Sequence, residues 1–197
     1  MEQWVWALLG LALGSLPFSV WVGQLGLKTD IRTVGDGNPG AFNVMRAGGF
    51  MWGGLAIALD IGKAALPIGL AAYVFNVTGA PLVAAAIAPA LGHAFSPWLG
   101  FKGGKAIAPS GGMWVGLTIW SVTLVGSLGL IVWFVMLTSS GWAVMFTMST
   151  ILVYLGLSGA PAEWFAAWGL SLLLLEYKHR AELRQPPRLR PPSGKRR

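Results

Sequence analysis

Two polar, glycine-rich segments separate apolar stretches of this sequence and carry residues suited to binding an anion. The first runs from Arg32 to Arg46 (RTVGDGNPGAFNVMR) and the second from Gly92 to Ala106 (GHAFSPWLGFKGGKA). Glycine permits positive φ and close backbone approach, so N–H groups can point toward an anion, and Arg and Lys supply positive charge. Both segments therefore predict phosphate-binding loops. A tight interfacial turn with solvated charges is the competing interpretation of the first segment.

A third charged segment, Glu176–Arg180 (EYKHR), follows the last apolar stretch. Taken alone, it is typical of the positively charged flank of a membrane span. In the second segment, Lys102 and Lys105 also suit membrane anchoring, and His93 also suits hydrogen-bonded packing. Charged and histidine side chains at membrane depth are nevertheless costly, and they are therefore candidates for function. Three such segments on one face of the membrane predict one shared site.

The composition is that of a membrane protein. Of the 197 residues, 55% are hydrophobic and only 11% are charged, and the mean hydropathy is +0.64, whereas soluble domains are more polar. The formal net charge of +7 does not indicate nucleic acid, because the basic residues lie mainly near the ends of apolar stretches. Anionic lipids and phosphorylated substrates fit that placement better. The absence of cysteine excludes disulfides, thiolate metal sites and thioester-forming enzymes.

Four apolar stretches are long enough to cross a bilayer, which takes roughly 20 residues per helix. They cover residues 4–27, 50–74, 81–99 and 107–175, and the last must hold several helices. All Lys and Arg residues except Lys63 fall in three clusters (28–46, 102–105 and 178–197), which the positive-inside tendency places in the cytoplasm. Lys63 follows Asp60 by three residues, a helical spacing at which the two side chains can pair.

The shared side of the three basic clusters constrains the topology. The N-terminus then lies outside, two spans join the first cluster to the second, and an even number joins the second to the third. We favour four crossings there, with turns near Ser121, Thr138–Gly141 and Ser158–Pro161. The prediction is an all-α polytopic membrane bundle with seven spans and a cytoplasmic C-terminus. Five spans plus a re-entrant hairpin buried in protein is the alternative.

We expect two parts in the chain. Residues 1–180 would form the membrane-embedded domain. Residues 181–197 are rich in Pro and Arg, and we expect them to be a disordered cytoplasmic tail lying against anionic headgroups. No metal site is expected, because the two histidines lie in distant segments without clustered carboxylates.

The polar segments contain short motifs that recur, in the same order and spacing, in a known family. They are GSLP at 14–17, GDGNPGAFNVMR at 35–46, GHAFSPWLGFKGGK at 92–105 and KHR at 178–180. They resemble the motifs G-S-I-P, G-S-G-N-P-G-A-T-N-V-x-R, G-H-x-F-S-x-x-L-x-F-K-G-G-K-G and K-H-R-E-N-I of the bacterial acyl-phosphate:glycerol-3-phosphate acyltransferases. The agreement covers nearly the whole chain except the tail.

The resemblance implies a seven-span enzyme of the bacterial inner membrane, without a cofactor, whose active site faces the cytoplasm. It would transfer the acyl group of acyl phosphate to the 1-hydroxyl of glycerol 3-phosphate, giving lysophosphatidate and phosphate in the first step of phospholipid synthesis. By position, the catalytic residues would be Arg46, His93 and Lys105. The substrate-binding residues would be Asp36, Gly37, Asn38, Asn43, Lys102, Gly103, Gly104, Thr147, His179 and Glu182.

Four positions depart from the family motifs: Asp36 stands for Ser, Phe42 for Thr, Ala106 for Gly and Glu182 for Asn. A carboxylate beside a phosphate dianion is repulsive unless it is protonated or paired, for instance Asp36 with Arg32, Arg46 or Lys105. A divergent, non-catalytic paralogue that binds an anionic lipid or phosphorylated metabolite therefore remains an alternative. A small transporter is a second one, disfavoured because all basic clusters lie on one face.

Other acyl-transfer chemistries lack their motifs. The sequence contains no G-x-S-x-G elbow of a serine hydrolase, and neither histidine begins an H-x4-D box, because Trp98 and Arg184 occupy the fifth following positions. An acyl phosphate is already electrophilic and has a good leaving group, so no covalent acyl-enzyme is required. We expect the substrate phosphate to accept the hydroxyl proton.

Overall fold

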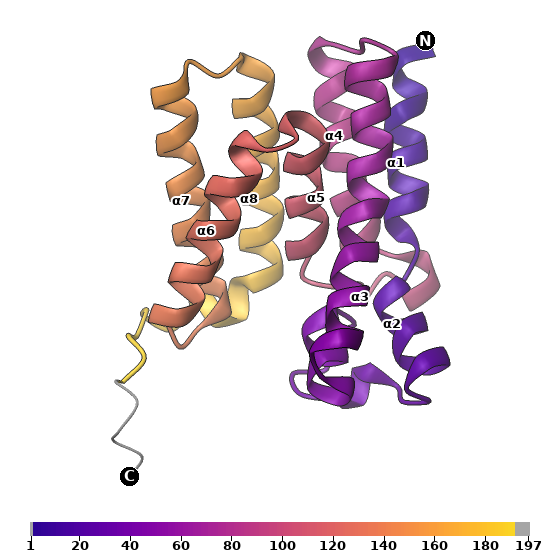
Figure 1. Ribbon diagram of the computed structural model, residues 1–197, viewed down its shortest axis with the longest axis vertical. Coiled ribbons are helices and arrows are strands. Elements are labelled where there is room, and N and C mark those ends of the chain that lie inside the picture. Colours follow the sequence, from indigo (N-terminus) through magenta and orange to yellow (C-terminus); the bar gives the residue numbers. More distant parts are fainter. Residues whose placement is uncertain (1, 192–197) are drawn as a thin grey trace.

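The computed structural model describes residues 2–191, and its regular elements are helices joined by short links (Figure 1). The α-helices are α1 (Val5–Ser15), α2 (Phe18–Trp21), α3 (Ala41–Gly69), α4 (Gly79–Ala94), α5 (Ile107–Thr118), α6 (Ser121–Met136), α7 (Ser140–Ser158) and α8 (Ala162–Leu183). Short 3₁₀ turns cover Glu2–Trp4, Ile31–Thr33 and Pro97–Leu99, and π-helical turns cover Val22–Gly26 and Leu70–Val74. The predicted all-α bundle is confirmed.

Four helical segments are long and apolar enough to cross a membrane: Glu2–Gly26, Ala41–Val74, Gly79–Leu99 and Ser140–Ser158. Helix α6 is also apolar but shorter. Large apolar side chains point outward along these helices, among them Leu8 at 68%, Leu128 at 63% and Leu157 at 84% exposure. Such exposure suits contact with lipid chains, which are the solvent for a membrane bundle.

Helices α1 to α4 form one half of the molecule and α6 to α8 the other, with α5 between them (Figure 1). Two glycines bring α1 and α4 into close contact. A Cβ at Gly14 would collide with the backbone of Pro89, and a Cβ at Gly92 would collide with the carbonyl of Leu11. Small residues at such crossings let membrane helices approach closely. The GSLP and GHAFS segments are thereby fixed against each other.

The helix boundaries confirm some predictions and correct others. The links between α5, α6, α7 and α8 fall at 119–120, 137–139 and 159–161, where turns were predicted. The first polar segment, however, is not a loop throughout, because α3 begins at Ala41 instead of residue 50, with a break at Gly49 (φ 80°). The segment Glu176–Arg180 is also helical, because α8 continues to Leu183. The expected domain limit at residue 180 therefore falls inside α8.

The part of the tail that the structure describes lies beside the α6–α7 link. The N–H of Thr138 donates to the carbonyl of Arg188 at 3.0 Å, and the N–H of Arg190 donates to the carbonyl of Met136 at 2.7 Å. Residues 186–190, named here the C-terminal segment, are thus held by backbone hydrogen bonds. The remainder of the expected disordered tail, residues 192–197, lies outside the described residues.

Candidate active site

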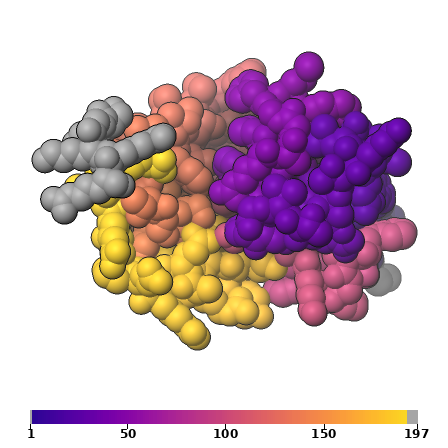
Figure 2. All heavy atoms as spheres, turned by 90° about the horizontal axis from the view of Figure 1, so that it is seen from below, coloured from indigo at the N-terminus to yellow at the C-terminus, as the bar shows by residue number. Residues whose placement is uncertain are grey.

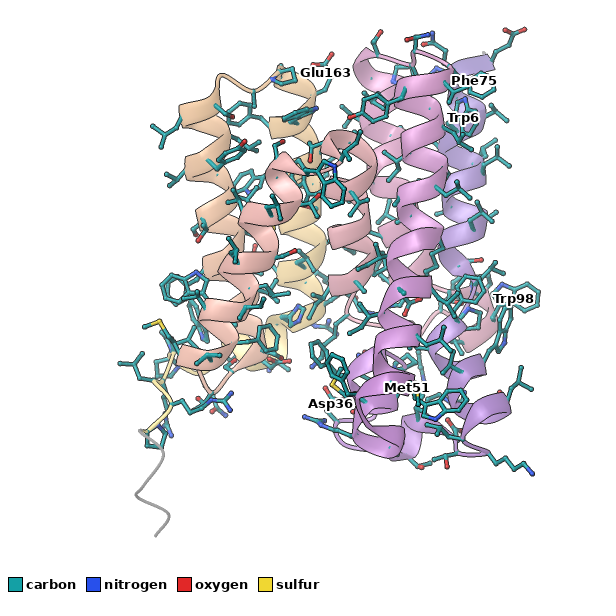
Figure 3. All side chains as sticks on the ribbon, in the orientation of Figure 1. Trp6, Asp36, Met51, Phe75, Trp98 and Glu163 are labelled. Carbon is teal, nitrogen blue, oxygen red and sulfur yellow. The ribbon has the colours of Figure 1, made fainter. Side chains whose placement is uncertain are left out.

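The three polar segments meet at one end of the bundle. Seen from that end, the start of α3 adjoins the α6–α7 link and the end of α8, and the link between α4 and α5 lies on the same face (Figure 2). Asp36 lies at this end, whereas Phe75 and Glu163 lie at the opposite one (Figure 3). A cavity of about 850 Å³ opens there, and its lining includes Asp36, Asn38, Arg46, Lys105, His179 and Glu182. The predicted convergence of the segments is confirmed.

Lys105 is the centre of the charged contacts. Its Nζ atom lies 2.7 Å from Oδ2 of Asp36 and 2.5 Å from Oε1 of Glu182. Burial alone would lower the pKa of Lys105, but the two carboxylates raise it above its ordinary value. Both acidic departures from the family motifs therefore pair with the same lysine. Of the three partners considered for Asp36, Lys105 is the close one, because Arg46 stays at 4.0 Å and Arg32 pairs with Asp30 at 2.8 Å.

The first polar segment is organised around Asn43, which is buried at the first turn of α3. Its Nδ2 donates to Oδ1 of Asp36 and to the carbonyl of Asn38, both at 2.9 Å, and its Oδ1 accepts from Nη1 of Arg46 at 3.1 Å. Burial alone would raise the pKa of Asp36, but the hydrogen bonds from Lys105, Asn43 and the Asn38 N–H lower it to about 2. Asp36 is therefore a carboxylate at any physiological pH.

Glycine conformation explains part of this loop. Gly35 has φ 60° and Gly37 has φ 73°, and glycine adopts such positive φ values without strain. A Cβ at Gly35 would collide with Nη1 of Arg46 and Oδ1 of Asn43. Gly40 instead has an extended backbone (φ −120°) and precedes the first turn of α3.

Glu182 has partners that the sequence alone does not reveal. Its Oε2 accepts from Oγ of Ser140 and from the N–H of Gly141, both at 2.6 Å, at the beginning of α7. A carboxylate there satisfies a free N–H donor and interacts favourably with the helix dipole. Glu182 therefore links three elements, α7, α8 and the Lys105 loop. No motif in the 137–141 link signals Ser140 and Gly141 as part of the site.

Gly103 and Gly104 pack against the end of α4. A Cβ at Gly103 would collide with the carbonyl of His93, and a Cβ at Gly104 would collide with Nε2 of the His93 ring. The close approach of this loop to His93 therefore requires glycine at both positions, apart from any N–H contact with a ligand. They bring Lys105 next to the His93 ring.

The predicted Asp60–Lys63 pair is confirmed, and it holds His93. The Nζ atom of Lys63 lies 2.7 Å from Oδ1 of Asp60, 2.7 Å from the carbonyl of Leu16 and 3.0 Å from Nδ1 of His93. Asp60 also accepts from Oγ of Ser19 at 2.6 Å. An ammonium group has three donors and no acceptor, so Nδ1 of His93 must accept and the neutral ring carries its proton on Nε2. That N–H faces the Gly104 side, where it can donate to an anionic oxygen.

His179 has the opposite arrangement. It is 1% exposed, and its Nδ1 lies 2.9 Å from the carbonyl of Leu175, one helical turn earlier. A carbonyl can only accept, so Nδ1 carries the proton. Nε2 then presents a lone pair, and among residues 2–191 it has no hydrogen-bond partner. His93 thus offers a donor, and His179 an acceptor, and each of them lines a cavity that Lys105 also lines.

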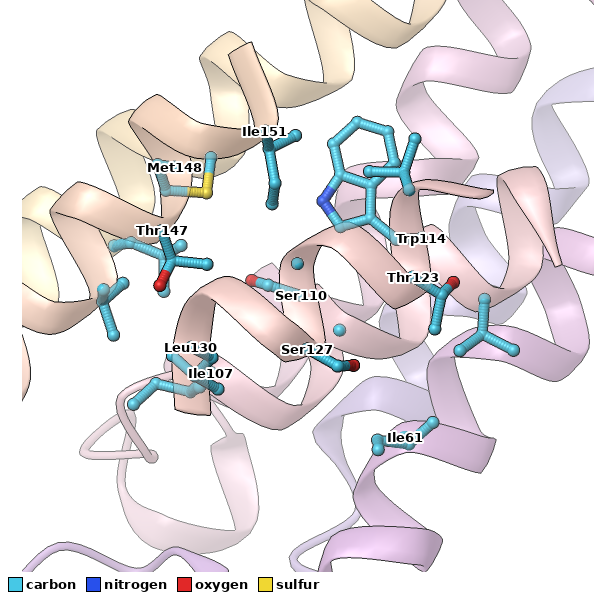
Figure 4. A pocket seen from close by; sticks show the side chains of 16 residues that line it. Ile61, Ile107, Ser110, Trp114, Thr123, Ser127, Leu130, Thr147, Met148 and Ile151 are labelled. Carbon is cyan, nitrogen blue, oxygen red and sulfur yellow. The ribbon is translucent and has the colours of Figure 1, made fainter. Parts of the chain in front are cut away.

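Two predicted residues lie apart from this cluster. Lys102 is exposed and lines a neighbouring cavity of about 400 Å³, together with Gly37, Gly103 and Lys178. Thr147 is buried in α7, where its hydroxyl donates to the carbonyl of Ala143 at 2.8 Å. It faces an apolar cavity between α5, α6 and α7 instead of the charged residues (Figure 4).

The apolar cavity of about 110 Å³ continues toward the charged site. It shares five lining residues with a second cavity of about 160 Å³ that also contacts Asn38, His93 and Lys105. The shared residues are Ile61, Ile107, Gly111, Ser127 and Leu130. An apolar path therefore leads from the charged end of the molecule into the bundle.

The chain is similar to known proteins over nearly its whole length. Residues 4–186 match the family described as "Glycerol-3-phosphate acyltransferase". A glycerol-3-phosphate acyltransferase of Anaeromyxobacter dehalogenans (strain 2CP-C) is 38% identical over 194 residues, which cover 89% of each chain. One of Maridesulfovibrio salexigens is 32% identical over 187 residues, which cover 92% of each chain.

Solved structures agree as well. The crystal structure of PlsY (YgiH), described as an integral membrane glycerol 3-phosphate acyltransferase, in its glycerol 3-phosphate form matches with a TM-score of 0.83 at 29% identity, covering 93% of this chain and 91% of that chain. Its lysophosphatidic acid form matches with a TM-score of 0.81 at 28% identity. The chain belongs to the glycerol-3-phosphate acyltransferase family.

Proposed function

We propose that this protein transfers the acyl group of an acyl phosphate to the 1-hydroxyl of glycerol 3-phosphate, giving 1-acyl-glycerol 3-phosphate (lysophosphatidate) and inorganic phosphate. The observation that carries the proposal is the convergence of Arg46 and Lys105 from separate segments on one large cavity beside His93. The related PlsY structures are a glycerol 3-phosphate form and a lysophosphatidic acid form. These two compounds are the acceptor and the product of the proposed reaction.

The reaction balances without a covalent intermediate. The hydroxyl oxygen bonds to the carbonyl carbon, the bond from that carbon to the phosphate oxygen breaks, and the hydroxyl proton leaves on the phosphate. The cations would bind the two phosphate groups and bring the hydroxyl into line. The Nε2–H of His93 would donate to an oxygen that gains charge in the transition state, a contribution of about 3 kcal/mol for such donors in other enzymes.

The acyl chain would occupy the apolar path between α5, α6 and α7. Its lining is almost entirely hydrocarbon, and only Gly111, Ser127 and their neighbours separate it from the charged cavity. A long-chain acyl phosphate would thus place its phosphate at Lys105 and its chain among the helices.

For the topology we propose seven crossings in a bacterial inner membrane, with the site facing the cytoplasm, because the basic residues gather at the end that carries the site. Helix α5 has 12 residues and measures about 18 Å, so a re-entrant α5–α6 hairpin is the competing arrangement. The chain has no cysteine, so one cysteine placed at Ile119 can be tested for labelling from outside. Labelling supports seven crossings, and protection in intact cells supports the hairpin.

The acidic residues at positions 36 and 182 are compatible with catalysis. Asp36 and Glu182 are paired with Lys105 and are not isolated charges in the cavity. The alternative is a non-catalytic paralogue that binds anionic lipid or a phosphorylated metabolite. The experiment is to incubate the purified protein with glycerol 3-phosphate and either palmitoyl phosphate or palmitoyl-CoA, and to identify the lipid product by mass spectrometry. Lysophosphatidate from palmitoyl phosphate alone supports the proposal, and no product from either donor supports the paralogue.

A further inference from the structure

The C-terminal segment (residues 186–190) carries two arginines into the large cavity. The family match ends at residue 186, and the chain then passes beside the lower end of α6 (Figure 1). Arg188 and Arg190 both line the 850 Å³ cavity with Arg46 and Lys105. These arginines therefore lie outside the motifs of the family but inside the site of this chain.

The segment is anchored mainly by Arg190. Its N–H donates to the carbonyl of Met136, and its Nη2 donates to the carbonyls of Phe134 and Leu137 at 3.0 and 3.1 Å. The carbonyl of Arg188 accepts from the N–H of Thr138. Backbone hydrogen bonds on both sides of Leu189 thus fix the position of the Arg188 backbone, from which the side chain extends.

The other cations of the cavity are already engaged. Lys105 contacts two carboxylates, and Lys178 donates to the carbonyls of Ala94 and Gly103 at 2.9 and 3.0 Å. Arg46 donates to Asn43. Within residues 2–191, the Arg188 guanidinium makes no hydrogen bond, and the side chain is exposed at the cavity. Arg188 can therefore bind a ligand in this cavity without breaking a hydrogen bond that the described residues make.

We propose that Arg188 is a further substrate-binding residue, which donates hydrogen bonds to a phosphate dianion in the cavity. Asp36 and Glu182 neutralise the positive charge of Lys105, and Arg188 supplies a positive charge in its place. The inference rests on the proposed function. A planar guanidinium forms paired hydrogen bonds with phosphate. The ligand is a phosphate monoester dianion, and both glycerol 3-phosphate and acyl phosphate carry one.

The test compares Arg188→Ala with Arg184→Ala, a matched control, because Arg184 follows α8 directly and lies outside the lining of this cavity. Initial rates are measured in neutral lipid while either glycerol 3-phosphate or palmitoyl phosphate is varied. We expect Arg188→Ala to raise one KM about fivefold to tenfold with kcat nearly unchanged, and Arg184→Ala to leave both constants unchanged. The substrate whose KM rises identifies the phosphate that Arg188 binds.

Two further variants separate binding from a change in the fold. Arg188→Lys keeps the charge but loses the paired hydrogen bonds, so its KM should lie between those of the wild type and Arg188→Ala. Arg190→Ala releases the anchor and should reproduce the Arg188→Ala phenotype. Unchanged KM values for Arg188→Ala, an equal effect of Arg184→Ala, or an effect seen only with anionic lipid would overturn the assignment. The last result would assign Arg188 to headgroup contact. If the wild-type protein itself forms no product, the proposed function fails, which is a different result from wild-type turnover with an unaffected variant.

Discussion

Lys105 and Glu182, 77 residues apart in the sequence, form a charged hydrogen bond of 2.5 Å that joins the α4–α5 link to the end of α8. The same lysine also bonds Asp36 in the first polar segment. This three-way contact joins the first two polar segments and the end of α8 at the charged end of the molecule. A substrate dianion must compete with these carboxylates or bind beside them, which makes the two acidic residues the features that most distinguish this site from the family pattern.

Asp36→Ser restores the family residue and removes one competitor of the substrate phosphate. The Asp36 side chain is 45% exposed, and exposed ion pairs contribute up to about 1 kcal/mol, so the KM for glycerol 3-phosphate should fall about twofold to fivefold. The pKa of Asp36 is lowered to about 2. The negative charge of Asp36 is therefore fully present above its ordinary pKa and is lost only as the pH falls toward 2. The ratio of the KM of the wild type to that of Asp36→Ser should thus stay constant from pH 6 to 8. An increase in KM would show that the carboxylate assists binding.

Glu182 combines a charge with a helix-capping role, and two variants separate them. Glu182→Gln keeps an oxygen for Ser140 and Gly141, whereas Glu182→Ala leaves those donors without it. Loss of such a cap costs about 1 kcal/mol, and up to about 2. Both variants lose the ion pair with Lys105, so thermal unfolding in detergent should show a lower Tm for both, and a further decrease for Glu182→Ala because it also loses the cap. Equal Tm values for both variants would contradict the capping role.

Gly111 lies where the apolar path joins the charged cavity, and a Cβ there would meet nothing within 4 Å. Gly111→Leu should fill this space without a clash and block long acyl chains. We expect kcat/KM for palmitoyl phosphate to fall at least about tenfold, with a smaller effect on a short-chain acyl phosphate. Gly156→Leu is the control, because Gly156 lies on the exposed face of α7 and its Cβ position is also open. A parallel loss for both chain lengths would argue against an acyl-chain path.

The tautomer of His93 can be measured directly, because the chain has only two histidines. Nitrogen NMR of ¹⁵N-labelled protein in lipid should show a protonated Nε2 and an unprotonated Nδ1 for His93, with the reverse for His179. A His179→Gln sample assigns the signals. The double variant Asp60→Asn/Lys63→Met removes both buried charges together. It should abolish the preference of the His93 ring for a proton on Nε2. A proton on Nδ1 of His93 in the wild-type protein would contradict the proposed donor role.

The spacing of apolar and charged residues predicts much of this architecture, because membrane helices need long apolar stretches and basic residues favour one side. The three turns after residue 107 and the convergence of the polar segments follow from that pattern. The start of α3 at Ala41 does not, because the glycine-rich composition of 35–49 favours a loop, whereas Asn43 and Arg46 are oriented by a helical turn.

The candidate site was predictable where charge and spacing carried the signal. Charge and composition made Lys105, Arg46 and His93 candidates, and the resemblance to the family motifs assigned them to the active site. The pairing of Asp60 with Lys63 followed from helical spacing. The contact of Lys63 with His93 is between residues 30 apart, and no local pattern indicates it. Ser140 and Arg188 were missed because a serine in a turn and an arginine in a Pro-rich tail have no distinctive spacing. Thr147 was assigned to substrate binding by position, and it faces the apolar cavity.

The most direct test of the central proposal is the release of inorganic phosphate from palmitoyl phosphate by purified protein in lipidic mesophase, with and without glycerol 3-phosphate, for wild-type protein and for Lys105→Ala. We predict release that depends on glycerol 3-phosphate in the wild type. In the variant, we predict a loss of at least about 100-fold with the protein still folded and membrane-inserted. Full activity of Lys105→Ala, or wild-type release that is independent of glycerol 3-phosphate, would contradict the proposal.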